Sequence, residues 1–126
     1  MPPRKILIVD DDMDVIRVLK ESLEVEGYGV MVGFDGQMAV NLARKQKPDL
    51  IILDVTMPMT NGFKALEFLR KFPETAGIPV IFLTGVSSQD VYPHLVKHTR
   101  VAHLKKPLDL ADLHSVLSEF LPPAAA

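Results

Sequence analysis

The chain of 126 residues contains no cysteine, carries little net charge and has no long apolar run. Without cysteine it can form no disulfide, use no thiol nucleophile and bind no zinc through sulfur. A formal net charge of −2 creates no field that would gather nucleic acid or anionic lipid. No stripe of Lys and Arg interleaved with aromatic residues is present either, so we expect no nucleic-acid binding by this chain.

The apolar runs are as long as strands and too short for membrane spans, and the basic N-terminus is not followed by a signal-peptide core. We therefore expect a cytoplasmic protein without membrane association. Apolar residues make up 48% of the chain and charged residues 24%, which is typical of a globular protein. The length predicts one domain over residues 1–121, followed by a flexible tail or linker stub at 122–126.

Short aliphatic runs alternate with segments of helical periodicity. The aliphatic runs predict strands at residues 6–9, 28–34, 50–53, 78–83 and 101–104. Helices are predicted up to Gly27, after Asp35, from Gly62, near Asp90 and after Asp109. Five strands alternating with five helices predict a parallel sheet covered by helices on both faces.

Polar side chains stand where four of these strands end. Asp10 follows the first strand, Asp54 the third, Thr84 the fourth and Lys106 the fifth. Open parallel sheets place their chemistry just outside the carboxyl ends of the strands, so these residues are candidates for a functional site. Two purely structural alternatives remain open, because Asp54 could cap the following turn and Asp12 could cap the following helix.

If these strand ends lie side by side, the aspartates form a cluster that needs a cation. The available ligands are hard oxygen atoms, which suit Mg²⁺. Asp54 would then be placed as a nucleophile toward phosphorus and would form an aspartyl phosphate. The Lys106 ammonium and the Thr84 hydroxyl would supply positive charge and a donor for the transferred phosphoryl group.

Four motifs carry a resemblance to a known family. They are Ile8-Val9-Asp10-Asp11, Leu53-Asp54 followed by Met57-Pro58 and Gly62, Leu83-Thr84-Gly85, and Lys105-Lys106-Pro107. At these separations the chain resembles the receiver domain of a bacterial two-component response regulator over essentially its whole length. The resemblance implies a flavodoxin-like, CheY-like fold, which is a doubly wound five-stranded parallel sheet of order 2-1-3-4-5 with five helices.

The resemblance also implies a phosphoacceptor and a metal site. Asp54 matches the family's phosphoacceptor, and Asp10 and Asp11 match its acidic metal-binding pair. Asp54 and the backbone carbonyl of Thr56 match the remaining protein ligands of Mg²⁺. We expect this set to hold the cation beside the acceptor carboxylate.

A switch is implied on the neighbouring strands. Thr84 matches the switch hydroxyl, and Lys106, joined to Pro107 by a cis peptide bond, matches the family's lysine. His103 stands where the family usually has an aromatic residue that turns inward. Thr99-Arg100 replaces a common Gly-Ala pair, so the surface that reports phosphorylation departs from the family pattern.

The function implied is that of a phospho-accepting signalling module rather than a turnover enzyme. It would take a phosphoryl group from a histidine kinase or a histidine phosphotransfer protein and hydrolyse it slowly. Its output would be a downstream protein target, or an effector domain if the chain is part of a longer protein, and a homodimer is compatible with the family. The alternative is a phosphorylation-independent interaction module on a receiver-like scaffold, which the departures around Pro93 and His103 keep open.

Two other chemistries have weaker support. His94, His98 and His103 could form a zinc or copper site, but no local carboxylate or cysteine completes it. A phosphohydrolase of the haloacid dehalogenase type would use an Asp-x-Asp motif on the first strand, and Asp10-x-Asp12 meets this only superficially. The setting of Asp54 argues against that second alternative.

Overall fold

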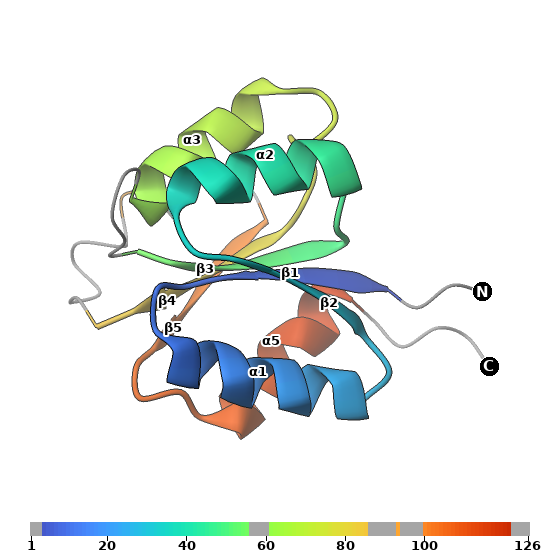
Figure 1. The fold of residues 1–126 in the computed structure, drawn as a ribbon, viewed down its shortest axis with the longest axis vertical. Coiled ribbons are helices and arrows are strands. Elements are labelled where there is room, and N and C mark those ends of the chain that lie inside the picture. The colour runs from blue at the N-terminus through green and yellow to red at the C-terminus, as the bar shows by residue number, and fades with distance from the viewer. Residues whose placement is uncertain (1–3, 56–60, 86–92, 94–99, 122–126) are drawn as a thin grey trace.

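The computed structural model describes residues 4–55, 61–85, 93 and 100–121, and within them five parallel strands form one sheet (Figure 1). The strands are β1 (Lys5–Val9), β2 (Gly29–Gly33), β3 (Leu50–Asp54), β4 (Val80–Thr84) and β5 (Val101–Lys105). The helices of the described part are α1 (Met13–Val25), α2 (Gly36–Gln46), α3 (Gly62–Lys71) and α5 (Leu110–Phe120). The sheet order is β2-β1-β3-β4-β5, which confirms the predicted order. The helix predicted near Asp90 lies outside the described residues, so four of the five predicted helices are observed.

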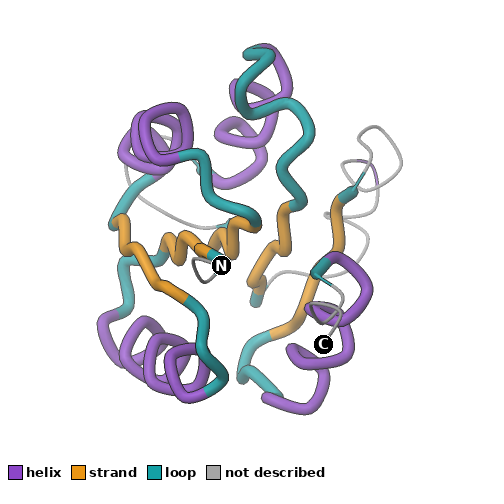
Figure 2. The backbone as a smooth tube through the Cα atoms, turned by 90° about the vertical axis from the view of Figure 1, so that its right-hand side faces the viewer, coloured by secondary structure: helices purple, strands orange, loops and turns teal. Residues whose placement is uncertain are grey.

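The sheet separates two helical layers (Figure 2). Helices α2 and α3 cover one face, and α1 and α5 cover the other. Side chains of β3 alternate between the layers: Ile51 and Leu53 pack with α2 and α3, whereas Leu50 and Ile52 pack with α1 and α5. Burial on both faces explains why the central strands are continuous aliphatic runs.

Each described helix begins at a side chain that caps its free backbone N–H groups. Asp12, Asp35, Asn61 and Asp109 are the N-caps of α1, α2, α3 and α5, and their side-chain oxygens accept hydrogen bonds from backbone N–H groups of the first turn. The predicted end of α1 is also confirmed, because Gly27 has a φ of +95° just past the helix. Local sequence signals therefore set most helix boundaries.

The fourth strand begins two residues later than predicted. The backbone N–H of Ile78 donates to the Thr75 carbonyl oxygen at 3.1 Å, so Ile78 belongs to the turn that follows α3. The buried Thr75 hydroxyl also donates to the Leu69 carbonyl oxygen at 2.6 Å and ties this turn to α3. An aliphatic run alone cannot reveal which of its residues pair with a neighbouring strand.

Among the described residues, no helix has the length and apolar character needed to cross a membrane.

Candidate functional site

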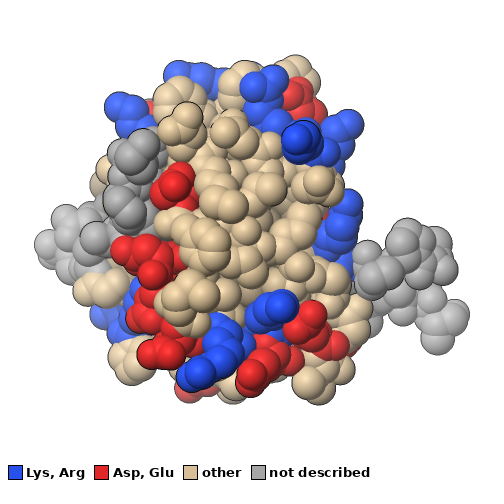
Figure 3. Space-filling model, viewed as in Figure 1, with Lys and Arg blue, Asp and Glu red and all other residues tan. Residues whose placement is uncertain are grey.

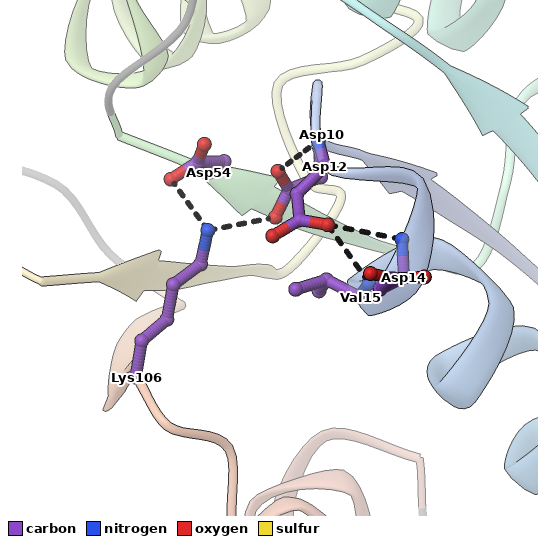
Figure 4. A network of polar contacts seen from close by, with 6 residues as sticks. All are labelled: Asp10, Asp12, Asp14, Val15, Asp54 and Lys106. Atoms are coloured by element: carbon purple, nitrogen blue, oxygen red, sulfur yellow. Dashed lines mark hydrogen bonds and ion pairs between the residues drawn. The ribbon is translucent and has the colours of Figure 1, made fainter.

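The carboxyl ends of β1, β3 and β4 meet at one edge of the sheet, where the predicted site residues are found. Asp10 follows β1 directly, Asp54 is the last residue of β3, and Thr84 is the last residue of β4. These three strands are neighbours in the sheet. Lys106 follows β5 and points its ammonium group toward Asp10 and Asp54 (Figure 4).

Three carboxylates converge at this edge. Asp10, Asp11 and Asp54 each place an oxygen within 4.8 Å of the others. Asp10 is fully buried, Asp54 is 4% exposed, and Asp11 lies on the surface. The cluster therefore concentrates negative charge at a position that solvent reaches from one side.

The Lys106 ammonium lies between two of these carboxylates. Its Nζ atom is 3.1 Å from Asp10 Oδ2 and 3.6 Å from Asp54 Oδ1. Burial alone would lower the pKa of Lys106, but hydrogen bonding to Asp10 and the negative charges of Asp54 and Asp10 outweigh this and raise the pKa above its ordinary value. Lys106 is therefore positively charged at neutral pH and offsets part of the negative charge.

Asp12 has a structural role in the network. Its Oδ1 accepts hydrogen bonds from the backbone N–H groups of Asp14, at 2.9 Å, and Val15, at 3.4 Å (Figure 4). Its own backbone N–H donates to Asp10 Oδ1 at 2.9 Å. The helix-capping interpretation of Asp12 is confirmed, and the cap also orients the Asp10 carboxylate.

The donor set fits a small divalent cation. Three carboxylates supply hard oxygen ligands, which Mg²⁺ prefers. Within the described parts of the chain, buried Asp10 Oδ2 is contacted by the Lys106 ammonium alone, at 3.1 Å. One ammonium beside three carboxylates leaves net negative charge, so Asp10, Asp11 and Asp54 are suited to hold Mg²⁺.

Thr84 and His103 lie on the same face of the sheet. In the register of β4 and β5, Phe82 is opposite His103 and Thr84 is opposite Lys105. Paired residues of parallel strands, and residues two apart on one strand, point to the same face. Phe82 packs in the core cluster that includes α3, so Thr84 and His103 also stand on that side of the sheet. Thr84 is 1% exposed and His103 is half-buried.

Gly62 packs closely against the backbone of Asp54 and Val55 at the end of β3. A Cβ atom at this position would lie 2.5 Å from the Asp54 carbonyl oxygen and 3.0 Å from Val55 Cα. The Gly62 backbone N–H donates to the Val55 carbonyl oxygen at 3.0 Å. Close packing explains this glycine, since its φ is not positive.

Three residues of the predicted sites lie outside the part of the chain that the structure describes. Thr56, whose carbonyl was expected to bind the metal, lies outside the described residues, as do His94 and His98. The peptide bond between Lys106 and Pro107 is cis.

A groove beside the cluster was not predicted from the sequence. It has a volume of about 600 Å³ and runs between the start of α1 and the segment after β5. Its walls include Val15 and Val18 from α1, and Lys106, Pro107 and Leu108 from the segment after β5. Val18 is 45% exposed despite its apolar side chain, and nothing in the helical spacing of α1 distinguishes it from the buried apolar residues of that helix.

Comparisons with known proteins point in one direction. Residues 6–118 match the family model of the response regulator receiver domain. The chain is 46% identical over 85 residues to the transcriptional regulatory protein CpxR of Escherichia coli, covering 68% of this chain and 35% of CpxR. It is also 30% identical over 122 residues to sporulation initiation phosphotransferase F of Bacillus subtilis, covering 97% of both chains.

A solved structure extends the similarity to the fold. The receiver domain of a sensor histidine kinase from Pseudomonas aeruginosa, solved with a magnesium ion coordinated in its active-site cleft, superposes with a TM-score of 0.85 at 27% identity. The superposition covers 96% of this chain and 99% of that domain. Against CpxR, by contrast, the chain spans about a third of the relative's length, at 35%.

Proposed function

Since the chain belongs to the response regulator receiver domain family, whose members are phospho-accepting signalling domains rather than turnover enzymes, we propose that Asp54 is its phosphoacceptor. An Asp54 carboxylate oxygen attacks the phosphorus of a phosphohistidine on a kinase or phosphotransfer protein. The new P–O bond forms as the P–N bond breaks, and the electron pair of that bond returns to the imidazole. The observation that carries the proposal is the convergence of Asp54 with Asp10, Asp11 and Lys106 at the carboxyl edge of the sheet.

Neighbouring groups balance the charge of the phosphoryl group. Lys106, whose ammonium is 3.6 Å from Asp54 Oδ1, pairs with a phosphoryl oxygen after transfer. Thr84, at the end of the adjacent strand, donates its hydroxyl to another oxygen. Asp10, Asp11 and Asp54 would hold Mg²⁺, with the Thr56 carbonyl as the further ligand that the family resemblance implies, and the bound cation would supply positive charge to the phosphoryl group.

The conformational output begins at Thr84. Movement of its hydroxyl toward phospho-Asp54 opens space on the face of the sheet that it shares with His103. His103 then changes position, in place of the aromatic residue that the family commonly has. The altered surface binds a downstream protein, acts on an effector domain of a longer protein, or forms a homodimer.

The groove beside Lys106 suits the phosphodonor. A histidine kinase or phosphotransfer protein must bring its phosphohistidine to Asp54, and the groove adjoins the site with apolar walls from Val15, Val18 and Leu108. Burial of those walls supplies affinity for the donor, whereas the carboxylates supply the chemistry. Hydrolysis of the aspartyl phosphate by water then resets the domain slowly.

Phosphorylation can be tested by measuring the intact mass after incubation with acetyl phosphate and Mg²⁺. We expect a gain of one phosphoryl group that requires Mg²⁺ and disappears in Asp54→Ala and in EDTA. Asp14→Asn is a matched control, because Asp14 is an exposed acid near the site. Its side chain forms an ion pair with Arg17 and not with Lys106. Equal labelling of Asp54→Ala and the unmodified protein would refute the assignment, and beryllofluoride binding replaces mass as the readout if the phosphate is short-lived.

A further inference from the structure

The two helical layers carry opposite charge. Helices α2 and α3 contain five Lys and Arg residues against one Glu, a net of +4. Helices α1 and α5 contain two Lys and Arg residues against five Asp and Glu, a net of −3. Figure 3 shows Lys and Arg side chains gathered over α2 and α3, whereas acidic side chains are frequent over α1. A chain with a net charge of −2 therefore presents a basic face.

A groove with aromatic walls crosses this basic face. It has a volume of about 310 Å³ and lies between α2 and α3, where its walls include Val40, Arg44, Phe68 and Phe72. Phe68 is 39% exposed, although its chain neighbour Leu69 is fully buried. By volume the groove has room for on the order of ten liquid waters, which matches one or two apolar side chains of a partner. Exposed aromatic surface of this kind is characteristic of binding sites rather than of bare helix surfaces.

Cations flank both aromatic rings. The Arg44 guanidinium lies 3.8 Å from the centroid of the Phe72 ring, and Lys71 Nζ lies 5.4 Å from the centroid of the Phe68 ring. Both cations belong to the exposed surface, so a bound carboxylate can reach them while an apolar side chain packs on the rings. Acidic and apolar groups are thus recognised together.

The pair of Glu74 with Arg44 shows how a carboxylate of this chain binds beside the groove. Glu74 Oε1 accepts a hydrogen bond from Arg44 Nε at 2.9 Å. A hydrogen bond to its own backbone N–H, followed by the hydrogen bond from Arg44, lowers the pKa of Glu74. Lys71, by contrast, forms no ion pair with any residue in the described part of the chain. Its ammonium, beside the Phe68 ring of the groove, can therefore receive a carboxylate from outside.

We propose that the groove between α2 and α3 is a docking site for an acidic amphipathic segment of another protein. Apolar side chains of the segment fill the space above Phe68 and Phe72, and its carboxylates pair with Arg44 and Lys71. The site is on the α2 and α3 layer rather than the α1 groove where the phosphodonor is proposed to bind, so both partners can bind at once. An acidic segment is favoured over nucleic acid because the groove presents the apolar side chains of Val40, Phe68 and Phe72 beside its cations, and because the whole chain is weakly acidic.

The probe is a fluorescein-labelled helical peptide of about 15 residues with Glu on one face and Leu and Phe on the other. Its affinity for the full chain is measured by fluorescence anisotropy, and its position is mapped by amide chemical shifts. We expect shifts at Val40, Arg44 and Phe72 and loss of binding at high salt. A peptide with Lys in place of Glu should bind at least about tenfold more weakly, a difference of 1.4 kcal/mol.

Surface variants with matched controls identify the groove. Phe68→Ala and Lys71→Glu should each weaken peptide binding about tenfold or more. Phe34→Ala, another exposed aromatic, and Lys20→Glu, the same charge change on α1, should leave it within about twofold. Glu74→Gln should tighten binding, because it removes the negative charge that competes for Arg44. Equal effects of the test and control variants, or shifts centred on α1 and α5, would overturn the proposal.

Other occupants give distinct outcomes. If a random single-stranded oligonucleotide binds as tightly as the peptide and with the same variant pattern, the groove is a nucleic-acid site and the proposal fails. If sedimentation shows a dimer that Lys71→Glu dissociates, a second copy of the chain is the occupant and the proposal also fails. Asp54→Ala should bind the peptide normally, so failure of the phosphoacceptor assignment is distinguishable from failure of the docking site.

Discussion

Lys106 holds its ammonium group between two buried carboxylates, and its removal takes away the ion pair of Asp10 Oδ2. Asp10 is fully buried, so an uncompensated charge there is costly. We expect Lys106→Met to lower the free energy of unfolding by about 3 kcal/mol in EDTA. Added Mg²⁺ should recover much of this loss, because the cation replaces the ammonium as the counter-charge. Lys106→Met should bind Mg²⁺ no more weakly than the unmodified protein does. Urea unfolding measures both effects.

The pH dependence of this effect has a defined sign. The folded pKa of Lys106 is raised, so the stability it contributes is fully present below the unfolded value of about 10.4 and is lost as pH rises through the folded pKa. The difference in unfolding free energy between the unmodified protein and Lys106→Met should therefore stay constant from neutral pH to about 10 and shrink above it. Lys105→Met, at the exposed neighbour, is the control, and an equal loss of stability there would contradict the argument.

Residue chemistry made much of the site predictable. Asp10, Asp54 and Lys106 follow aliphatic runs, and the carboxyl ends of parallel strands share one edge, so their meeting could be inferred without coordinates. The capping role of Asp12 stayed an open alternative at that stage, because three consecutive acids offer the same chemistry in a sequence. The backbone path after β1 decides that Asp12 caps α1 and that Asp10 turns toward Lys106.

At the scale of elements, the Asp12 cap links α1 to the acidic cluster. Asp12→Ala removes the hydrogen bonds to the Asp14 and Val15 N–H groups and should cost about 1 kcal/mol of unfolding free energy. Asp12→Ser, which keeps a capping oxygen, should recover most of that loss. Both variants should still be phosphorylated at Asp54 with Mg²⁺, as intact mass would show. Loss of Mg²⁺ binding in Asp12→Ser would instead make Asp12 a metal ligand.

The contact between α3 and β3 depends on the absence of one side chain. In Gly62→Ala the new Cβ meets backbone atoms at 2.5 and 3.0 Å, so the helix or the end of β3 must move. We expect a loss of about 2 kcal/mol in unfolding free energy and slower phosphorylation, because Asp54 moves with its carbonyl. Gly77→Ala is the matched control, since its Cβ meets no atom within 4 Å. Similar losses in the two variants would show that packing is not the cause.

Most helices and strands could be predicted from the sequence, and the features that could not share one cause. Capping residues and aliphatic runs depend on local chemistry, so the four described helices and five strands were predicted. The start of β4 and the Thr75 hydrogen bond depend on which backbone groups meet across the turn after α3. The α2 and α3 groove likewise exists only after the two helices pack side by side.

At the scale of the whole molecule, the acidic cluster joins segments that are far apart in the chain. Asp10 and Asp11 follow β1 and Asp54 ends β3, so a cation bound there ties together the ends of two neighbouring strands of the sheet. A ligand that binds the folded state alone stabilises it by about 2.7 kcal/mol at a concentration of 100 times its Kd. Saturating Mg²⁺ should therefore raise the unfolding free energy of the whole domain by this order.

The distribution of this stabilisation separates global from local effects. We expect one urea transition that moves to higher denaturant with Mg²⁺, and slower amide exchange in β1 and β3 together. Asp11→Asn should reduce the Mg²⁺-dependent shift strongly, whereas Asp14→Asn should preserve it. Protection confined to the segment after β1 would mean that the cation binds the exposed acids near α1 and does not reach Asp54, because a cation held at the proposed site must stabilise β3 as well.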